Sequence, residues 1–117
     1  MGKVLLFHVH LFKANQILAL CKKTNHTVQL VTKDEYGKTI GALAGIMGMD
    51  KKKGGSGKEF DHEMMVFSEM DSKTLDDFLV EYKKAGIAPI KRKAIITPSN
   101  VSWTAEELYE ELDEHER

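Results

Sequence analysis

Cysteine, net charge and long apolar runs are all scarce in this sequence, and each scarcity excludes a class of protein. The 117 residues include a single cysteine, so no internal disulfide can form and nothing marks an oxidising compartment. The formal net charge is −1, whereas dedicated binders of nucleic acid or anionic membranes are usually basic. No apolar run approaches the roughly 20 residues that a membrane-spanning helix needs. We therefore expect a protein that binds neither a membrane nor nucleic acid.

Motifs of common nucleotide-binding enzymes are missing as well. Residues 54–58 resemble a phosphate-binding loop, but Lys52 stands where that motif requires its first glycine. Glu59 also stands where the motif requires Ser or Thr, and the run precedes a strand instead of following one. The sequence contains no GxGxxG motif and no nucleophile elbow. No cofactor and no catalytic residue is therefore expected.

The N-terminal segment lacks the usual targeting signals. His8 and His10 interrupt the apolar residues 4–7 before they reach the length of a signal-peptide core. Leu6 stands where a myristoylation motif needs Ser or Thr. The sequence therefore predicts a cytoplasmic protein.

Hydrophobic periodicity divides the chain into two halves that each contain a strand, a helix and a strand. The expected strands are residues 3–9, 27–32, 63–68 and 94–97. Helices are expected at residues 13–24, between the cap Ser72 and Gly86, and after Thr104, which forms a capping box with Glu107. Residues 3–9 are apolar on both faces, which is typical of a central strand. The length suits one domain over residues 1–117, with no internal repeat.

Residues 36–49 connect the two halves and decide the fold. On a helix, Gly41, Ala44, Gly45 and Gly48 would share one face that carries almost no side chains. This face is expected to pack closely on a sheet or a helix; the alternatives are a backbone wall beside a ligand and a glycine-rich loop that is not helical. If this stretch is a crossover helix, the fold is a small, mainly parallel, doubly wound α/β sheet. The alternative is a ferredoxin-like α+β sandwich with a long insertion. In both, residues 50–61 are expected to be a flexible loop rich in Lys and Gly.

A ligand site is expected only in the parallel fold, because ligands bind beyond the carboxyl ends of parallel strands. The residues at those ends are His8, His10, Ser68, Thr97 and Asn100, with Trp103 nearby. His8 and His10 point the same way on a strand, so they could share a metal, with His62 or Asp61 as a third ligand. The alternative is a solvated or hydrogen-bonded pair, and no metal is assigned.

A series of motifs resembles a known family. The motifs are Asp34-Glu35-Tyr36-Gly37, Gly41-Ala42-Leu43-Ala44-Gly45, Glu63-Met64-Met65-Val66-Phe67-Ser68, Thr97-Pro98-Ser99-Asn100, Trp103 and Glu107-Leu108-Tyr109-Glu110-Glu111-Leu112. In this order the sequence resembles the bacterial family called domain of unknown function 3783. The resemblance implies a small bacterial cytoplasmic protein and supplies no catalytic residues.

A good fold signal without a catalytic constellation indicates a non-enzymatic α/β module. We expect it to bind a protein partner, a second copy of itself or a small ligand. The alternative is a metal-dependent protein or a minor enzyme that uses His8 and His10 at the end of the first strand.

Overall fold

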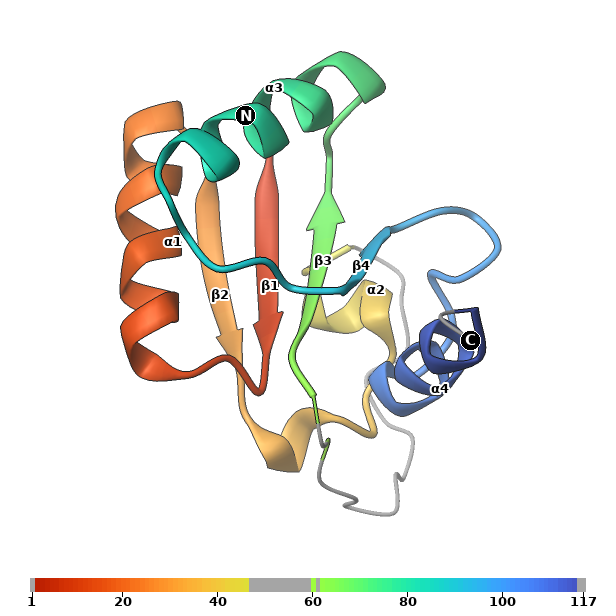
Figure 1. Ribbon diagram of the computed structural model, residues 1–117. Coiled ribbons are helices and arrows are strands. Elements are labelled where there is room, and N and C mark those ends of the chain that lie inside the picture. Colours follow the sequence, from red (N-terminus) through yellow and green to blue (C-terminus); the bar gives the residue numbers. More distant parts are fainter. Residues whose placement is uncertain (1, 47–59, 61, 116–117) are drawn as a thin grey trace.

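A four-stranded mixed sheet with helices on both faces forms the structure, a computed structural model that describes residues 2–46, 60 and 62–115 (Figure 1). The strands are β1 (Lys3–Phe7), β2 (Thr27–Val31), β3 (Met64–Ser68) and β4 (Arg92–Ile95). The helices are α1 (Leu11–Thr24), α2 (Ile40–Leu43), α3 (Ser72–Lys84) and α4 (Ala105–His115), and η1 (Lys33–Glu35) is a 3-10 turn. The α/β class with a mainly parallel sheet is confirmed. Apart from Phe60, the predicted loop at residues 50–61 lies outside the described residues.

The sheet order is β2-β1-β3-β4, and the direction of β3 sets the topology. β1 pairs parallel with β2, and β3 pairs parallel with β4. The central pair, β1 and β3, is antiparallel, with Leu5 opposite Val66. Figure 1 accordingly shows β1 and β2 pointing one way and β3 the other. The predicted central position of β1 is confirmed. β3 pairs with β1, whereas the ferredoxin-like alternative would pair β3 with β2.

Two hydrophobic cores lie on opposite faces of the sheet, because the central strands are apolar on both sides. Val4 and Leu6 of β1 face the core that contains α1 and α3. Leu5 and Phe7 face the other core, which contains α2 and the start of α4. The single cysteine, Cys21, is buried in the first of these cores, where burial raises the pKa of its thiol to about 12.

The connection between the halves differs from the predicted crossover helix. Among the described residues 36–46, only Ile40–Leu43 is helical, capped by Thr39, whose hydroxyl accepts a hydrogen bond from the Ala42 N–H at 3.2 Å. The helix stops because Gly45 adopts a φ of +81°, a left-handed conformation that favours glycine. Of the predicted packed face, Gly41 and Ala44 are buried, whereas Gly45 is exposed, and a Cβ on Gly45 would meet only the Lys3 Nζ, at 3.5 Å. Residues 47–49 lie outside the described residues.

Local capping signals fix where the longer helices begin. In α4, the Thr104 hydroxyl accepts from the Glu107 N–H (3.1 Å) and a Glu107 carboxylate oxygen accepts from the Thr104 N–H (2.9 Å), so the predicted capping box is confirmed. In α3, the cap is Asp71 instead of Ser72, since the Asp71 carboxylate accepts from the Thr74 N–H. None of the helices formed by the described residues is both apolar enough and long enough to cross a bilayer.

The first helix, α1, begins two residues earlier than its periodicity predicts. His10 caps it, because the His10 Nδ1 accepts from the Phe12 N–H at 3.2 Å. Leu11 and Phe12 are thereby the first two helical residues, and both are exposed.

Candidate functional site

The antiparallel central pair divides the predicted ligand-binding residues between the two ends of the sheet. The carboxyl end of β1, followed by His8 and His10, lies at the same end of the sheet as the start of β3. Ser68, at the carboxyl end of β3, lies at the opposite end of the sheet and is buried. The shared rim that a parallel arrangement would create is therefore not formed.

The loop after β4 is stabilised by contacts of Thr97, Asn100 and Trp103. The Thr97 N–H donates to the Asn100 Oδ1 (2.9 Å), and the Asn100 N–H donates to the Thr97 hydroxyl (3.2 Å). The Asn100 side-chain amide also donates to the Ile95 carbonyl at 3.1 Å. Trp103 packs against the core that contains α2, and its carbonyl accepts from the Ile40 N–H. These contacts shape a turn and its attachment to α2, and they use polar groups that a ligand would need.

A cavity of about 500 Å³ lies at the carboxyl end of β1, and three histidines line it. His8 and His10 come from the segment between β1 and α1, and His62 comes from the residues just before β3. Val9 and Glu63 complete the lining. The structure therefore brings together the two predicted histidines and the residue that the sequence suggested as a third partner.

The walls of this cavity are held by contacts between distant parts of the chain. The His62 backbone N–H donates to the Tyr109 hydroxyl of α4 at 2.8 Å. The Glu63 carboxylate pairs with the Lys13 ammonium of α1 at 2.6 Å, and both side chains are largely buried. A partly shielded ion pair of this kind is screened less by salt than an exposed one. The relative positions of α1 and the start of β3 are therefore fixed at the cavity.

Hydrogen bonding also determines what His10 can offer a ligand. Its Nδ1 is occupied as the acceptor of the α1 cap, so the neutral imidazole carries its proton on Nε2. The Nε2–H is then a hydrogen-bond donor. His8, with a φ of 60°, occupies the left-handed region at the turn after β1. Among the residues that the structure describes, no three His, Cys, Asp or Glu side chains are grouped so as to hold a metal ion.

Two large, exposed apolar side chains directly follow His10 in the sequence. They were not identified as functional residues from the sequence. Leu11 is 67% exposed and Phe12 is 70% exposed. They were missed because helical periodicity starts only at Lys13, and histidine is an uncommon cap. The sequence did contain a signal: two apolar residues that directly follow His10 and do not belong to the apolar face of the helix.

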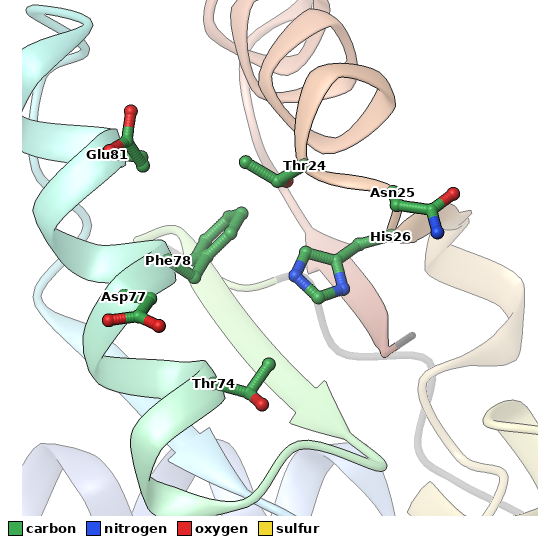
Figure 2. Close-up of a pocket in the computed structure, with 7 residues that line it drawn as sticks. All are labelled: Thr24, Asn25, His26, Thr74, Asp77, Phe78 and Glu81. Atoms are coloured by element: carbon green, nitrogen blue, oxygen red, sulfur yellow. The ribbon is translucent and has the colours of Figure 1, made fainter.

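A second cavity, of about 290 Å³, lies between the end of α1 and α3 (Figure 2). Figure 2 shows the His26 and Phe78 side chains next to each other in its lining, and their rings meet edge to face with centroids 5.7 Å apart. The His26 Nδ1 accepts from the Gly2 N–H at 2.8 Å, so His26 also secures the start of β1. Asp77, on the rim, pairs with Lys73 at 3.2 Å. The Nδ1 of His26 is therefore already used in a hydrogen bond within the protein.

We predict that His26 makes the protein less stable in acid. Burial lowers the pKa of His26 below its ordinary 6.5, so the unfolded chain binds more protons than the folded one around that pH. This contribution to stability is complete above pH 6.5 and is lost as the pH falls towards the lowered pKa. Melting temperatures measured from pH 7.5 to 5 should fall less in His26→Asn, which keeps a hydrogen-bond acceptor but does not titrate. Equal slopes in both proteins would contradict the prediction.

A third cavity, of about 360 Å³, lies beside α3 and has a mostly apolar lining that includes Met65, Leu79 and Ile90. The Tyr82 hydroxyl in its wall already donates to the Ala88 carbonyl at 2.7 Å. Burial raises the pKa of Tyr82 to about 12, so this phenol stays protonated at neutral pH. The lining therefore supplies few polar groups to orient a ligand.

Comparison with known proteins gives one similarity, in the second half of the chain. Residues 63–117 match the model of a family described as "Domain of unknown function (DUF3783)". The sequence resemblance to this family is therefore confirmed for that part. No curated protein and no solved structure matches the chain.

Proposed function

We propose that this chain, similar over residues 63–117 to a family of unknown function, is a non-enzymatic module that binds a protein partner. The surface proposed for binding consists of His8, His10, Leu11, Phe12 and His62 and is called the histidine surface below. The observation that carries the proposal is the exposure of Leu11 and Phe12 in the first turn of α1. Exposed apolar side chains that gather beside polar groups are typical of interaction sites.

The fold itself does not require apolar residues at these two positions. β3 continues into α3 in the same way that β1 continues into α1, through a residue with positive φ and a side-chain cap directly before the helix. The first two residues of α3 are Ser72 and Lys73, which are exposed and polar. Because α3 begins normally with these residues, the apolar pair at the start of α1 supports a role in binding.

The chemistry of the histidine surface suits a segment of protein that presents an apolar side chain and oxygen acceptors. Fully burying a Leu or Phe side chain contributes about 1.5–3 kcal/mol, and aromatic residues are frequent among the strongest contributors to binding. The His10 Nε2–H can donate to a carbonyl or carboxylate oxygen of the partner. Apolar contact would supply affinity, and the imidazoles would supply orientation.

This proposal includes a bacterial, cytoplasmic setting. The family resemblance supports a bacterial origin, and the single cysteine, buried as a free thiol, suits a reducing compartment.

We predict that Leu11→Ser combined with Phe12→Lys removes partner binding and leaves the fold intact. The two replacements are the residues that α3 carries at the same places, so the melting temperature should change by no more than about 2–3 °C, as is usual for surface substitutions. Quantitative mass spectrometry of proteins captured from source-cell extract should show at least one partner reduced more than tenfold.

Leu18→Ser is the matched control, because Leu18 is an exposed leucine on the same helix but away from its first turn. It should retain the partner. Capture that survives the double variant, or that is lost equally in the control, would contradict the proposal. If light scattering shows a concentration-dependent dimer that the double variant abolishes, the partner is a second copy of the chain.

A second candidate function is metal binding by His8 and His10, which line one cavity with His62 although the three side chains are not grouped as a metal site in the described structure. Zinc titration by calorimetry decides between the two. Zinc binding that is lost when His8 and His10 are both changed to Ala would assign the histidine surface to a metal. Absence of zinc binding, with partner capture unchanged in that variant, would assign binding to Leu11 and Phe12.

A further inference from the structure

The two halves of the chain have the same topology. In the first half, β1-α1-β2 places its first strand in the centre of the sheet and its second strand at the edge. In the second half, β3-α3-β4 does the same. α1 and α3 also cover the same face of the sheet. Because the central strands are antiparallel, a two-fold axis normal to the sheet would exchange the halves.

The register of the central strands satisfies this symmetry. Five residue pairs join β1 and β3, from Lys3 opposite Ser68 to Phe7 opposite Met64. The middle pair is Leu5 and Val66, and each is the third residue of its own five-residue strand. A shift of one residue in the register would have removed this correspondence. The axis therefore passes through the pair Leu5 and Val66.

Unusual backbone conformations recur at equivalent positions. The residue after each central strand has a positive φ, 60° at His8 and 62° at Glu69. A second such residue follows each of the helices α1 and α3, with φ of 68° at Asn25 and 74° at Gly86. The same number of residues separates the members of both pairs. Non-glycine residues with positive φ are uncommon, so their recurrence at one spacing is specific.

The segments that follow the edge strands repeat a sequence pattern. Both have threonine, six residues, threonine, three residues and leucine: Thr32, Thr39 and Leu43 in the first half, and Thr97, Thr104 and Leu108 in the second. The second threonine caps the following helix in each half, accepting from the N–H three residues on at 3.2 Å and 3.1 Å.

Hydrogen bonds between these two segments come in exchanged pairs. Thr39 and Thr104 form an isolated antiparallel bridge, so equivalent residues face each other. Two backbone bonds from the first segment to the second each have a counterpart from the second to the first. The pairs are Ile40 N–H to Trp103 carbonyl (2.8 Å) with Ala105 N–H to Lys38 carbonyl (3.1 Å), and Gly41 N–H to Val101 carbonyl (2.9 Å) with Glu106 N–H to Tyr36 carbonyl (3.2 Å).

We infer that the chain consists of two versions of one β-α-β-helix unit, fused in the arrangement of a symmetric dimer. The first version spans residues 2–46 and the second spans residues 63–111. The family match at residues 63–117 then covers one whole unit, and the first half is a diverged second unit. The sequence shows no repeat because the units share special backbone positions, caps and topology but few side chains.

The two-fold relation between the units makes the two ends of the sheet equivalent. The end of the sheet beyond β3 is equivalent to the histidine surface beyond β1. There Met70 packs on Gly2, where an added Cβ would lie 2.5 Å from the Met70 Cγ. Under the proposed function, the binding surface combines His8, His10, Leu11 and Phe12 of the first unit with His62 of the connection, and it lies outside the family match.

Two symmetric chains test the inference without relying on the proposed function. In one, residues 1–46 are replaced by a second copy of residues 62–111, keeping residues 47–61 as the connection. In the other, residues 62–117 are replaced by a second copy of residues 1–46. If the units are interchangeable, at least one chain is a monomer with cooperative unfolding. Its amide NMR spectrum then shows one resonance for each pair of equivalent strand and helix residues.

Two outcomes would overturn the inference. One is that neither symmetric chain folds as a monomer. The other is that the copies in a folded chain give two distinct sets of strand and helix resonances, which would mean that they occupy different structures. Partner capture is not part of this test, so failure of the proposed function leaves its result unaffected.

Discussion

Phe7→Ala is expected to lower the free energy of unfolding by about 3–5 kcal/mol, the usual cost of removing a fully buried aromatic side chain. Phe7 is completely buried at the end of β1. Its ring centroid lies 5.9 Å from that of Tyr36 and 6.2 Å from that of Phe60. Its removal would leave a cavity between the sheet and the segment that joins the halves. Because 1 kcal/mol corresponds to about 4 °C at this chain length, the melting temperature should fall by at least about 10 °C.

Phe12→Ala is the matched control, since it makes the same chemical change at a side chain that is 70% exposed. Its melting temperature should stay within about 2 °C of the parent. Thermal unfolding followed by circular dichroism measures both variants. A drop of similar size in the two variants would show that Phe12 is packed in the folded protein and would also remove the basis of the proposed binding surface.

Gly2→Ala is the second change for which we expect a large effect, about 1–3 kcal/mol, through overpacking. The new Cβ would lie 2.5 Å from the Met70 Cγ and 3.2 Å from the Ser68 carbonyl oxygen. Gly2 cannot move away easily, because its N–H donates to the His26 Nδ1 and its carbonyl accepts from the Thr27 N–H. A single methyl group must therefore displace Met70 or break these hydrogen bonds.

A double-mutant cycle with Met70→Ala identifies the cause. In the Met70→Ala background the clash with the Cγ is gone, so the cost of Gly2→Ala should fall to less than half. Urea unfolding of the four proteins gives the coupling free energy. Strict additivity would place the cost in the backbone of Gly2 instead of in its contact with Met70.

Strand positions in this fold could be predicted from side-chain patterns, whereas strand direction could not. β1 is apolar on both faces, and its central position followed from that alone. The alternation of side chains has the same period in either direction, so it carries no information about whether β3 runs with or against β1. Direction depends on the connection between the halves, where the positive φ of Gly45 ends α2.

The candidate site was only partly predictable, because part of the prediction depended on strand direction. His8 and His10 were identified from their spacing and His62 as their possible partner, and the three line one cavity. Ser68 was placed with them only on the assumption of parallel strands, and the antiparallel pair moves it to the other end of the sheet. Leu11 and Phe12 could not be recognised as exposed helical residues without knowing that His10 is the cap of α1.

The central antiparallel pair also has a consequence for how the chain acquires its structure. β1 finds one neighbour, β2, within the first half, but its other neighbour, β3, begins only at Met64. Until β3 arrives, β1 presents an unpaired apolar edge, which is a template for pairing with other chains. We therefore expect the first half to be vulnerable to aggregation during synthesis, until residues 64–68 are complete. Pairing with β3 covers this edge, and we expect this long-range step to be slow; the edges left in the folded sheet are those of β2 and β4.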